Sequence, residues 1–205
     1  MTKTQLRKRW ADTSFVDQLA IPRDRLPVVA ELRNLDLRGV PKLANGDPLW
    51  HFAIRDSDAH DIDFSFGDGC VGVSGSAVAN LCFEEFKFDR ATSFLRSSFT
   101  DCRFDRARLR LNAKDCEFTR CDFDLSTFAG GMSEYGFTRC TFVDCTFRSA
   151  RWKGTYFKAC TFESCDLEQF QVVDSVVTSI KHRDCTNFTD AIFTGGEVRS
   201  ITKLA

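Results

Sequence analysis

The sequence predicts an all-β solenoid, in which the chain winds into about seven stacked, four-sided coils behind a partly helical N-terminal cap. Three observations predict this fold. Phenylalanine dominates the aromatic residues, with 21 Phe against 2 Tyr. An apolar residue recurs at every fifth position over long runs, and similar residues recur again after about twenty positions. Such internal periodicity is typical of repeat proteins, in which each unit packs on the next.

The five-residue period is clearest in the stretch CTFVDCTFRSARWKGTYFKACTFESCDL, which runs from Cys140 to Leu167. An α-helix does not place positions i and i+5 on one side, and a flat strand turns its side chains over after five residues. A square coil fits, because a chain that turns a corner every five residues points each apolar centre inward. Stacked coils then pair backbone to backbone at a spacing of about 4.8 Å.

Centres four steps apart should lie above one another in the stack. This rule predicts one column of six rings and one column of the small residues that precede them: Phe64, Phe83, Phe104, Phe123, Phe142 and Phe162, with Cys102, Cys121, Cys140 and Cys160. The stretches 109–118 and 128–137 each break the step by one residue, which predicts that adjacent coils share a shortened corner. These ten residues are therefore the predicted core.

The tandem pattern of a small residue, any residue, Phe or Leu and two polar residues resembles the pentapeptide-repeat family. The resemblance covers Phe52 to Val198. It implies a right-handed quadrilateral β-helix, that is, a pentapeptide-repeat solenoid.

The chain divides into three expected parts. Residues 1–50 form the N-terminal cap with a short helix, residues 51–198 form the pentapeptide-repeat β-helix, and residues 199–205 form a C-terminal tail. A cap is needed because the end coil of a solenoid exposes backbone and interior. The apolar stripe of a cap helix that ends before Pro22 is predicted to consist of Leu6, Trp10, Thr13, Val16 and Ala20.

The ten cysteines are interpreted as small apolar fillers of a narrow interior. A zinc site is the alternative, but the C-x4-C spacings of Cys116/Cys121 and Cys140/Cys145 differ from the usual C-x2-C. Disulfides are the other alternative, and stacked cysteines on neighbouring coils would hold their Cβ atoms farther apart than a disulfide prefers. We therefore expect neither a metal ion nor a cofactor.

The sequence contains no recognisable catalytic constellation. His51, His60 and His182 belong to no Ser/His/Asp or H-E-x-x-H pattern, and His182 is interpreted as a residue of the core or of an end coil. The glycine-rich stretch 67–80 lacks the lysine and the spacing of a phosphate-binding loop. We expect no catalytic residues and no enzymatic activity.

The charge balance argues against direct nucleic-acid binding. The net charge of the whole chain is −1, with 9 basic and 6 acidic residues in positions 1–50. The basic residues Arg103, Arg106, Arg108, Arg110 and Lys114 alternate around the predicted coil and are interrupted by acids, so no continuous phosphate-binding track is expected.

A cluster of aspartates near the start of the repeats is the candidate partner-binding surface. It consists of Asp56, Asp58, Asp61, Asp63 and Asp68. Several of these carboxylates should project outward and could engage a basic protein. The alternative is a solvated surface that discourages association.

The resemblance also suggests a function. C-x-F-rich repeats are similar to the branch of the family that binds bacterial DNA gyrase as a DNA-like rod and protects it from topoisomerase poisons. The resemblance further implies a homodimer through the C-terminal coil. A rigid protein-interaction scaffold unrelated to gyrase is the alternative.

The expected compartment is the cytoplasm. The basic N-terminus is followed by no apolar signal region, and no stretch of about 18–20 apolar residues suggests a membrane span.

Overall fold

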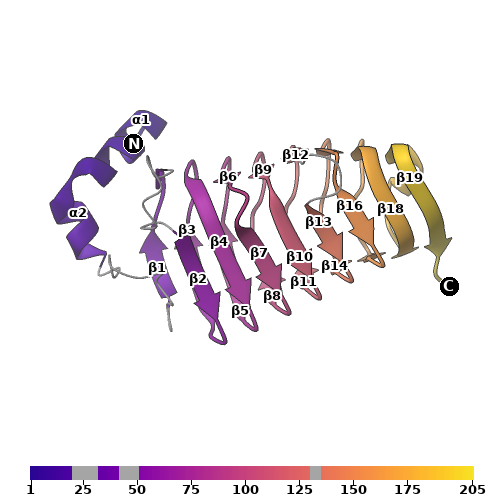
Figure 1. Ribbon diagram of the computed structural model, residues 1–205, viewed down its shortest axis with the longest axis horizontal. Helices are drawn as coiled ribbons and strands as arrows, with labels where there is room; N and C mark the ends of the chain where they lie inside the picture. The colour runs from indigo at the N-terminus through magenta and orange to yellow at the C-terminus, as the bar shows by residue number, and fades with distance from the viewer. Residues whose placement is uncertain (20–31, 42–50, 130–134) are drawn as a thin grey trace.

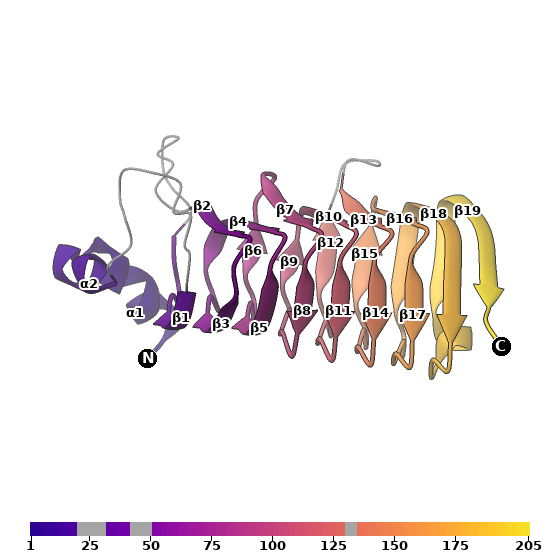
Figure 2. The same ribbon diagram turned by 90° about the horizontal axis from the view of Figure 1, so that it is seen from below.

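The structure is a computed structural model, and it describes residues 1–19, 32–41, 51–129 and 135–205. It is a parallel β-solenoid of about seven turns with short helices at its N-terminal end, which confirms the predicted β-helix with a cap (Figures 1 and 2). Each turn has four sides, which we number in chain order. Successive turns pair in parallel, so that residues about twenty positions apart become neighbours.

The strands of the first side lie side by side across the front of Figure 1. They are β2 (His51–Arg55), β4 (Asp68–Ser74), β7 (Thr92–Leu95), β10 (Leu111–Lys114), β13 (Gly136–Thr138) and β16 (Tyr156–Lys158). The second side consists of β1 (Leu32–Asp36), β3 (Ala59–Asp63), β5 (Ala77–Cys82), β8 (Ser98–Thr100), β11 (Glu117–Thr119), β14 (Thr141–Val143) and β17 (Thr161–Glu163). The strands β1, β3 and β5 continue around the next corner, so Asp63 and Cys82 already lie on the third side.

The other two sides are shorter. On the third side, isolated parallel bridges join Cys82, Arg103, Asp122, Thr146, Asp166 and Thr186 in that order. The fourth side consists of β6 (Lys87–Phe88), β9 (Arg108–Leu109), β12 (Thr127–Ala129) and β15 (Arg151–Lys153). The long strands β18 (Gln171–Arg183) and β19 (Ile192–Lys203) bend around the corners of the last turns, with a 3₁₀ turn, η3 (Phe188–Asp190), between them.

The corners use a left-handed backbone conformation. In the corner after the second side, Asp101, Arg120 and Asp144 have φ of 54°, 51° and 52°. This conformation costs energy for residues other than glycine. Hydrogen bonds between coils offset the cost: the Arg120 amide donates to the Val143 carbonyl over 2.9 Å, and the Asp101 amide donates to the Thr119 carbonyl over 3.0 Å.

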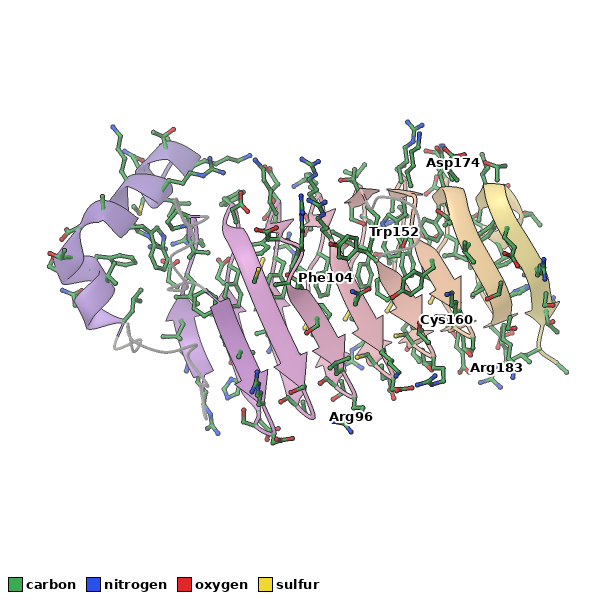
Figure 3. The ribbon with its side chains drawn as sticks, viewed as in Figure 1. Arg96, Phe104, Trp152, Cys160, Asp174 and Arg183 are labelled. Carbon is green, nitrogen blue, oxygen red and sulfur yellow. The ribbon has the colours of Figure 1, made fainter. Side chains whose placement is uncertain are left out.

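The interior is filled by stacked rings and small side chains. All ten predicted core residues are buried, with at most 2% of their surface exposed. Phe104 and Trp152 point into the solenoid between the sheets, and so does Cys160 (Figure 3). The Trp152 indole Nε1 donates to the Ser126 hydroxyl over 2.9 Å, which satisfies the polar atom of the largest buried ring.

The predicted single column of six phenylalanines is wrong after its fourth member. Phe123 stacks on Phe147 at a centroid distance of 5.0 Å, and Phe142 stacks on Phe118 at 5.1 Å. The first four rings of the predicted column therefore lie on the third side, and the last two lie on the second. The thiols are divided in the same way: Cys145 follows Cys121, and both donate to carbonyls of the coil below.

The cause is the stretch 128–137, which does not shorten a corner. Phe128 pairs with Leu109 on the fourth side, and Phe137 pairs with Ala113 on the first. One corner therefore separates Phe128 from Phe137, where the prediction placed two short steps. Because this stretch sets the register back by one side, every centre after it lies above a different column from the one predicted.

The cap consists of α1 (Lys3–Lys8), η1 (Arg9–Ala11) and α2 (Thr13–Gln18). A capping box of Thr2 and Gln5 begins α1. Of the predicted apolar stripe, Leu6, Trp10 and Val16 are buried, whereas Thr13 is exposed because the helix is broken at η1. Ala20 and Pro22 lie outside the described residues.

Arginine side chains tie the cap to the first coil. Arg9 donates to both carboxylate oxygens of Asp36 over 2.8 and 2.7 Å, and the Trp10 indole donates to the Arg38 carbonyl over 2.9 Å. The hydrogen bond from Arg9 holds the pKa of Asp36 well below its usual range. The solenoid begins earlier than predicted, since β1 pairs with β3. It also ends later, since β19 includes residues 199–203 of the expected tail.

The inward and outward positions differ in their expected contribution to stability. Phe123→Ala should cost about 3–5 kcal/mol, because the ring is stacked between Phe104 and Phe147 at 4.7 and 5.0 Å. Arg120→Ala should change the stability far less, because it removes only an exposed ion pair with Asp101. Urea denaturation of both variants measures this difference. Equal shifts of the two denaturation midpoints would contradict the placement of Phe123 inside the solenoid and of Arg120 on its surface.

Candidate protein-binding surface

Two columns of carboxylates run along the third side of the rod. One column contains Asp63, Asp122 and Asp166, and the other contains Glu84, Asp105, Asp124 and Glu168. Asp105 is only 6% exposed, and its carboxylate pairs with Arg103 and Arg106. Three arginines, Arg38, Arg103 and Arg148, stand in the same two columns. We call these seven carboxylates the acidic side. It arises because acids separated by about twenty residues lie on successive coils.

The arginines bridge neighbouring coils within the acidic side. Arg148 pairs with Asp124 over 2.8 Å, and Arg103 pairs with Glu84 over 3.5 Å. Arg106, at the adjoining corner, also pairs with Glu84, over 2.8 Å. These contacts hold the carboxylates in fixed positions and neutralise part of their charge, so the surface is acidic but not uniformly so.

Asp122 is the member of this surface whose negative charge is least favourable in the folded state. Burial raises the pKa of its carboxyl group, and the nearby carboxylates of Asp124 and Asp105 raise it further. The Asp124 amide donates to Asp122 Oδ1 over 2.8 Å, and the Thr146 hydroxyl lies 3.4 Å from the same oxygen. Ionisation of Asp122 therefore lowers the stability of the folded chain.

The five aspartates predicted to bind a partner do not form one surface. Asp56 lies at the corner after the first side, Asp58 on the second side and Asp61 at the next corner. Asp63 lies on the third side and Asp68 on β4 beside the fourth. In a coil with five-residue sides, acids close in sequence point in different directions. Only Asp63 belongs to the acidic side, and the signal that identifies the other members is the twenty-residue period.

The remaining polar groups of the interior and ends suggest no reaction chemistry. All ten cysteines are free thiols, and burial raises the pKa of Cys121. His182 stacks on Phe188 with a centroid distance of 3.7 Å, and burial lowers its pKa. No group of three or more metal-ligating side chains occurs within residues 1–19, 32–41, 51–129 and 135–205. In the same ranges, no helix is long and apolar enough to cross a bilayer.

The sequence period and the coil geometry indicate the same kind of fold. Five-residue units with an inward Phe or Leu and an inward small residue form each side, and four such sides form each turn. The chain therefore folds as a four-sided parallel β-helix of the pentapeptide-repeat kind. No protein-family model matches its sequence, and no curated protein matches it.

The solved structures to which this chain is similar include two forms of QnrB1, a plasmid-mediated fluoroquinolone resistance protein. A trypsin-treated single-residue variant has 17% identity, covers 84% of this chain and 91% of its own, and gives a TM-score of 0.42. The full-length form has 15% identity, covers 85% of this chain and 93% of its own, and gives a TM-score of 0.34. HetL from Nostoc sp. strain PCC 7120 is involved in heterocyst differentiation regulation. It has 9% identity, covers 98% of this chain and 94% of its own, and gives a TM-score of 0.21. At such scores and identities, these likenesses transfer no function to this chain.

The raised pKa of Asp122 predicts that this residue affects stability in a pH-dependent way. Because its pKa is higher in the folded state, ionisation of Asp122 opposes folding increasingly as the pH rises above about 4. Asp122→Asn should therefore raise the thermal midpoint at pH 7. The gain should disappear near pH 3, where the carboxyl group is protonated in both states. A variant less stable than wild type at pH 7 would contradict this description.

Proposed function

We propose that this chain is a non-enzymatic scaffold that binds a basic protein surface through its acidic side. We further propose that the surface is the DNA-binding region of a type II topoisomerase such as DNA gyrase, which the chain protects from topoisomerase poisons. The observation that supports the proposal is the column arrangement of seven carboxylates against three arginines on one side of a straight rod. The resemblance of the C-x-F repeats to gyrase-binding members of the family supports the choice of partner.

The charge of the rod is much lower than that of DNA. Seven coils span about 34 Å, a length over which duplex DNA carries about 20 negative charges. The acidic side supplies only seven carboxylates, partly neutralised by arginine. Attraction to a basic surface would steer the encounter, whereas affinity would depend mainly on the shape and rigidity of the rod.

The ion pairs within the acidic side favour a second candidate function. A scaffold that binds a protein other than gyrase needs rigid polar surfaces but no continuous negative charge, and Arg103 and Arg148 interrupt that charge. The two functions differ in whether the chain acts on gyrase at all. The ten free thiols suit a reducing compartment such as the cytoplasm under either function.

A supercoiling assay with DNA gyrase and a fluoroquinolone tests the proposal. The wild-type chain should restore supercoiling and reduce the amount of cleaved DNA. The variant Asp124→Asn/Asp166→Asn/Glu168→Gln should lose at least about tenfold in potency, because three neighbouring negative charges are removed from the acidic side.

The matched control removes the same charge from elsewhere on the rod. Asp56→Asn/Asp174→Asn/Glu197→Gln changes three exposed acids outside the acidic side, and it should stay within about twofold of wild type. If the wild-type chain neither protects nor inhibits gyrase with several poisons, the gyrase proposal is wrong and the other scaffold function replaces it.

We also propose that two copies associate end to end through their C-terminal coils. Among the described residues, only β18 pairs with β19, so the outer edge of β19 is open. Ile192 and Val198 on this strand are 44% and 40% exposed, and Phe193 is only partly buried. An open strand edge beside exposed apolar side chains favours pairing, and a second copy offers the same surface.

Sedimentation measurements test the association. Val198→Glu should convert the dimer to a monomer, because it places a charge at the centre of the proposed interface. The matched control is Leu125→Glu, which changes a residue that is 51% exposed at a corner of the rod. A wild-type chain that remains monomeric at about 100 μM would overturn the proposal.

A further inference from the structure

The fourth side carries a row of basic residues that lies outside the acidic side. Parallel pairing places Lys87 beside Arg108, Arg108 beside Thr127 and Thr127 beside Arg151. We call Lys87, Arg108 and Arg151 the basic row. All three side chains are exposed, and the residue between them, Thr127, is uncharged. Positive charge therefore follows the rod over four successive coils.

The basic row differs from the other arginines in having no acidic partner. Within the part of the chain that the structure describes, Lys87, Arg108 and Arg151 make no ion pair and no side-chain hydrogen bond. By contrast, three arginines at or beside other corners each pair with a carboxylate on a neighbouring coil over 2.6–2.7 Å, namely Arg120, Arg139 and Arg183. The charges of the row are thus available to an external anion.

Two further cations lie beside the row. Lys153 is exposed and pairs with Asp174 over 3.2 Å, and the Arg110 guanidinium lies 5.6 Å from the centroid of the Tyr135 ring. Figure 3 places Asp174 at the upper edge of the rod, at the corner that follows the fourth side, and Arg183 at the opposite edge. The positive charge therefore lies on a different part of the surface from the pair of Arg183 and Glu163.

The shape and composition of this side favour a nucleic acid over an acidic protein. The basic residues stand on short parallel strands, so they form a line and do not converge on a pocket that would enclose one small anion. Contacts to a phosphate backbone need no buried apolar or aromatic anchor. Thr127 within the row and Gln171 after it are polar and uncharged, and Asp68 precedes Lys87 at the N-terminal end of the line.

We propose that the basic row binds the phosphate backbone of duplex nucleic acid without reading its sequence. The row spans three coil steps, or about 14 Å, which corresponds to about four phosphates of one strand along the duplex axis. Arginine and lysine both suit phosphate, and regular spacing along a straight rod suits a linear polyanion. The expectation of no nucleic-acid contact relied on the net charge, which does not register that opposite charges lie on different sides.

Fluorescence anisotropy with a labelled duplex of about 20 base pairs tests this inference. The full chain should bind the duplex at low salt. The logarithm of the binding constant should fall with the logarithm of salt concentration with a slope of about −2.7, as three phosphate contacts require. Arg108→Gln/Arg151→Gln should weaken binding at least about tenfold and reduce the slope to about −0.9.

The matched control is Arg120→Gln/Arg183→Gln, which removes the same charge from exposed positions elsewhere on the rod. It should bind the duplex within about twofold of wild type. Circular dichroism of both double variants verifies that they are folded.

Three results would overturn the inference: no binding by the wild-type chain at low salt, equal losses in the two double variants, or equally effective competition by polyglutamate of the same charge. The last result would indicate an acidic protein as the partner. This outcome is independent of the gyrase assay, because the variants tested there change only carboxylates.

Discussion

The packing of one large ring and one small side chain inside each five-residue side is the constraint on which the structure depends. Phe104 and Phe123 stack with centroids 4.7 Å apart, close to the spacing of paired strands. Because ring stacking and backbone pairing require the same separation, each coil fits on the next without adjustment. The corners then must turn within a few residues, which explains why residues such as Arg120 adopt a left-handed conformation.

The same constraint determines what could be predicted from the sequence. The inward positions follow from local spacing, so the coil, the buried rings and the small cysteines were predictable. The register between distant coils was not, because the stretch 128–137 can be divided into two short steps or treated as one side followed by extra residues. These two ways of dividing the stretch are distinguished only by the pairing of Phe128 with Leu109 and of Phe137 with Ala113. For the cap, spacing identified Leu6 and Trp10 but not the break that exposes Thr13.

Surface charge follows from register rather than from composition. A chain with a net charge of −1 places Glu84, Asp105 and Asp124 in one column and Lys87, Arg108 and Arg151 in another. The candidate surface was therefore missed by a search for acids close in sequence, since Asp56, Asp58 and Asp61 point in different directions. A twenty-residue period, read with the correct register, is the signal that identifies it. Two oppositely charged sides also allow one rod to contact two unlike partners.

The central claim is that the acidic side is the surface that contacts a protein partner. Carboxylate footprinting tests it most directly: exposed acids are coupled to an amine with a carbodiimide, with and without DNA gyrase, and labelling is measured by mass spectrometry. We expect gyrase to protect Asp124, Asp166 and Glu168, and to leave Asp174 and Glu197 as reactive as in the free chain. Protection spread evenly around the rod, or confined to Asp174 and Glu197, would contradict the claim.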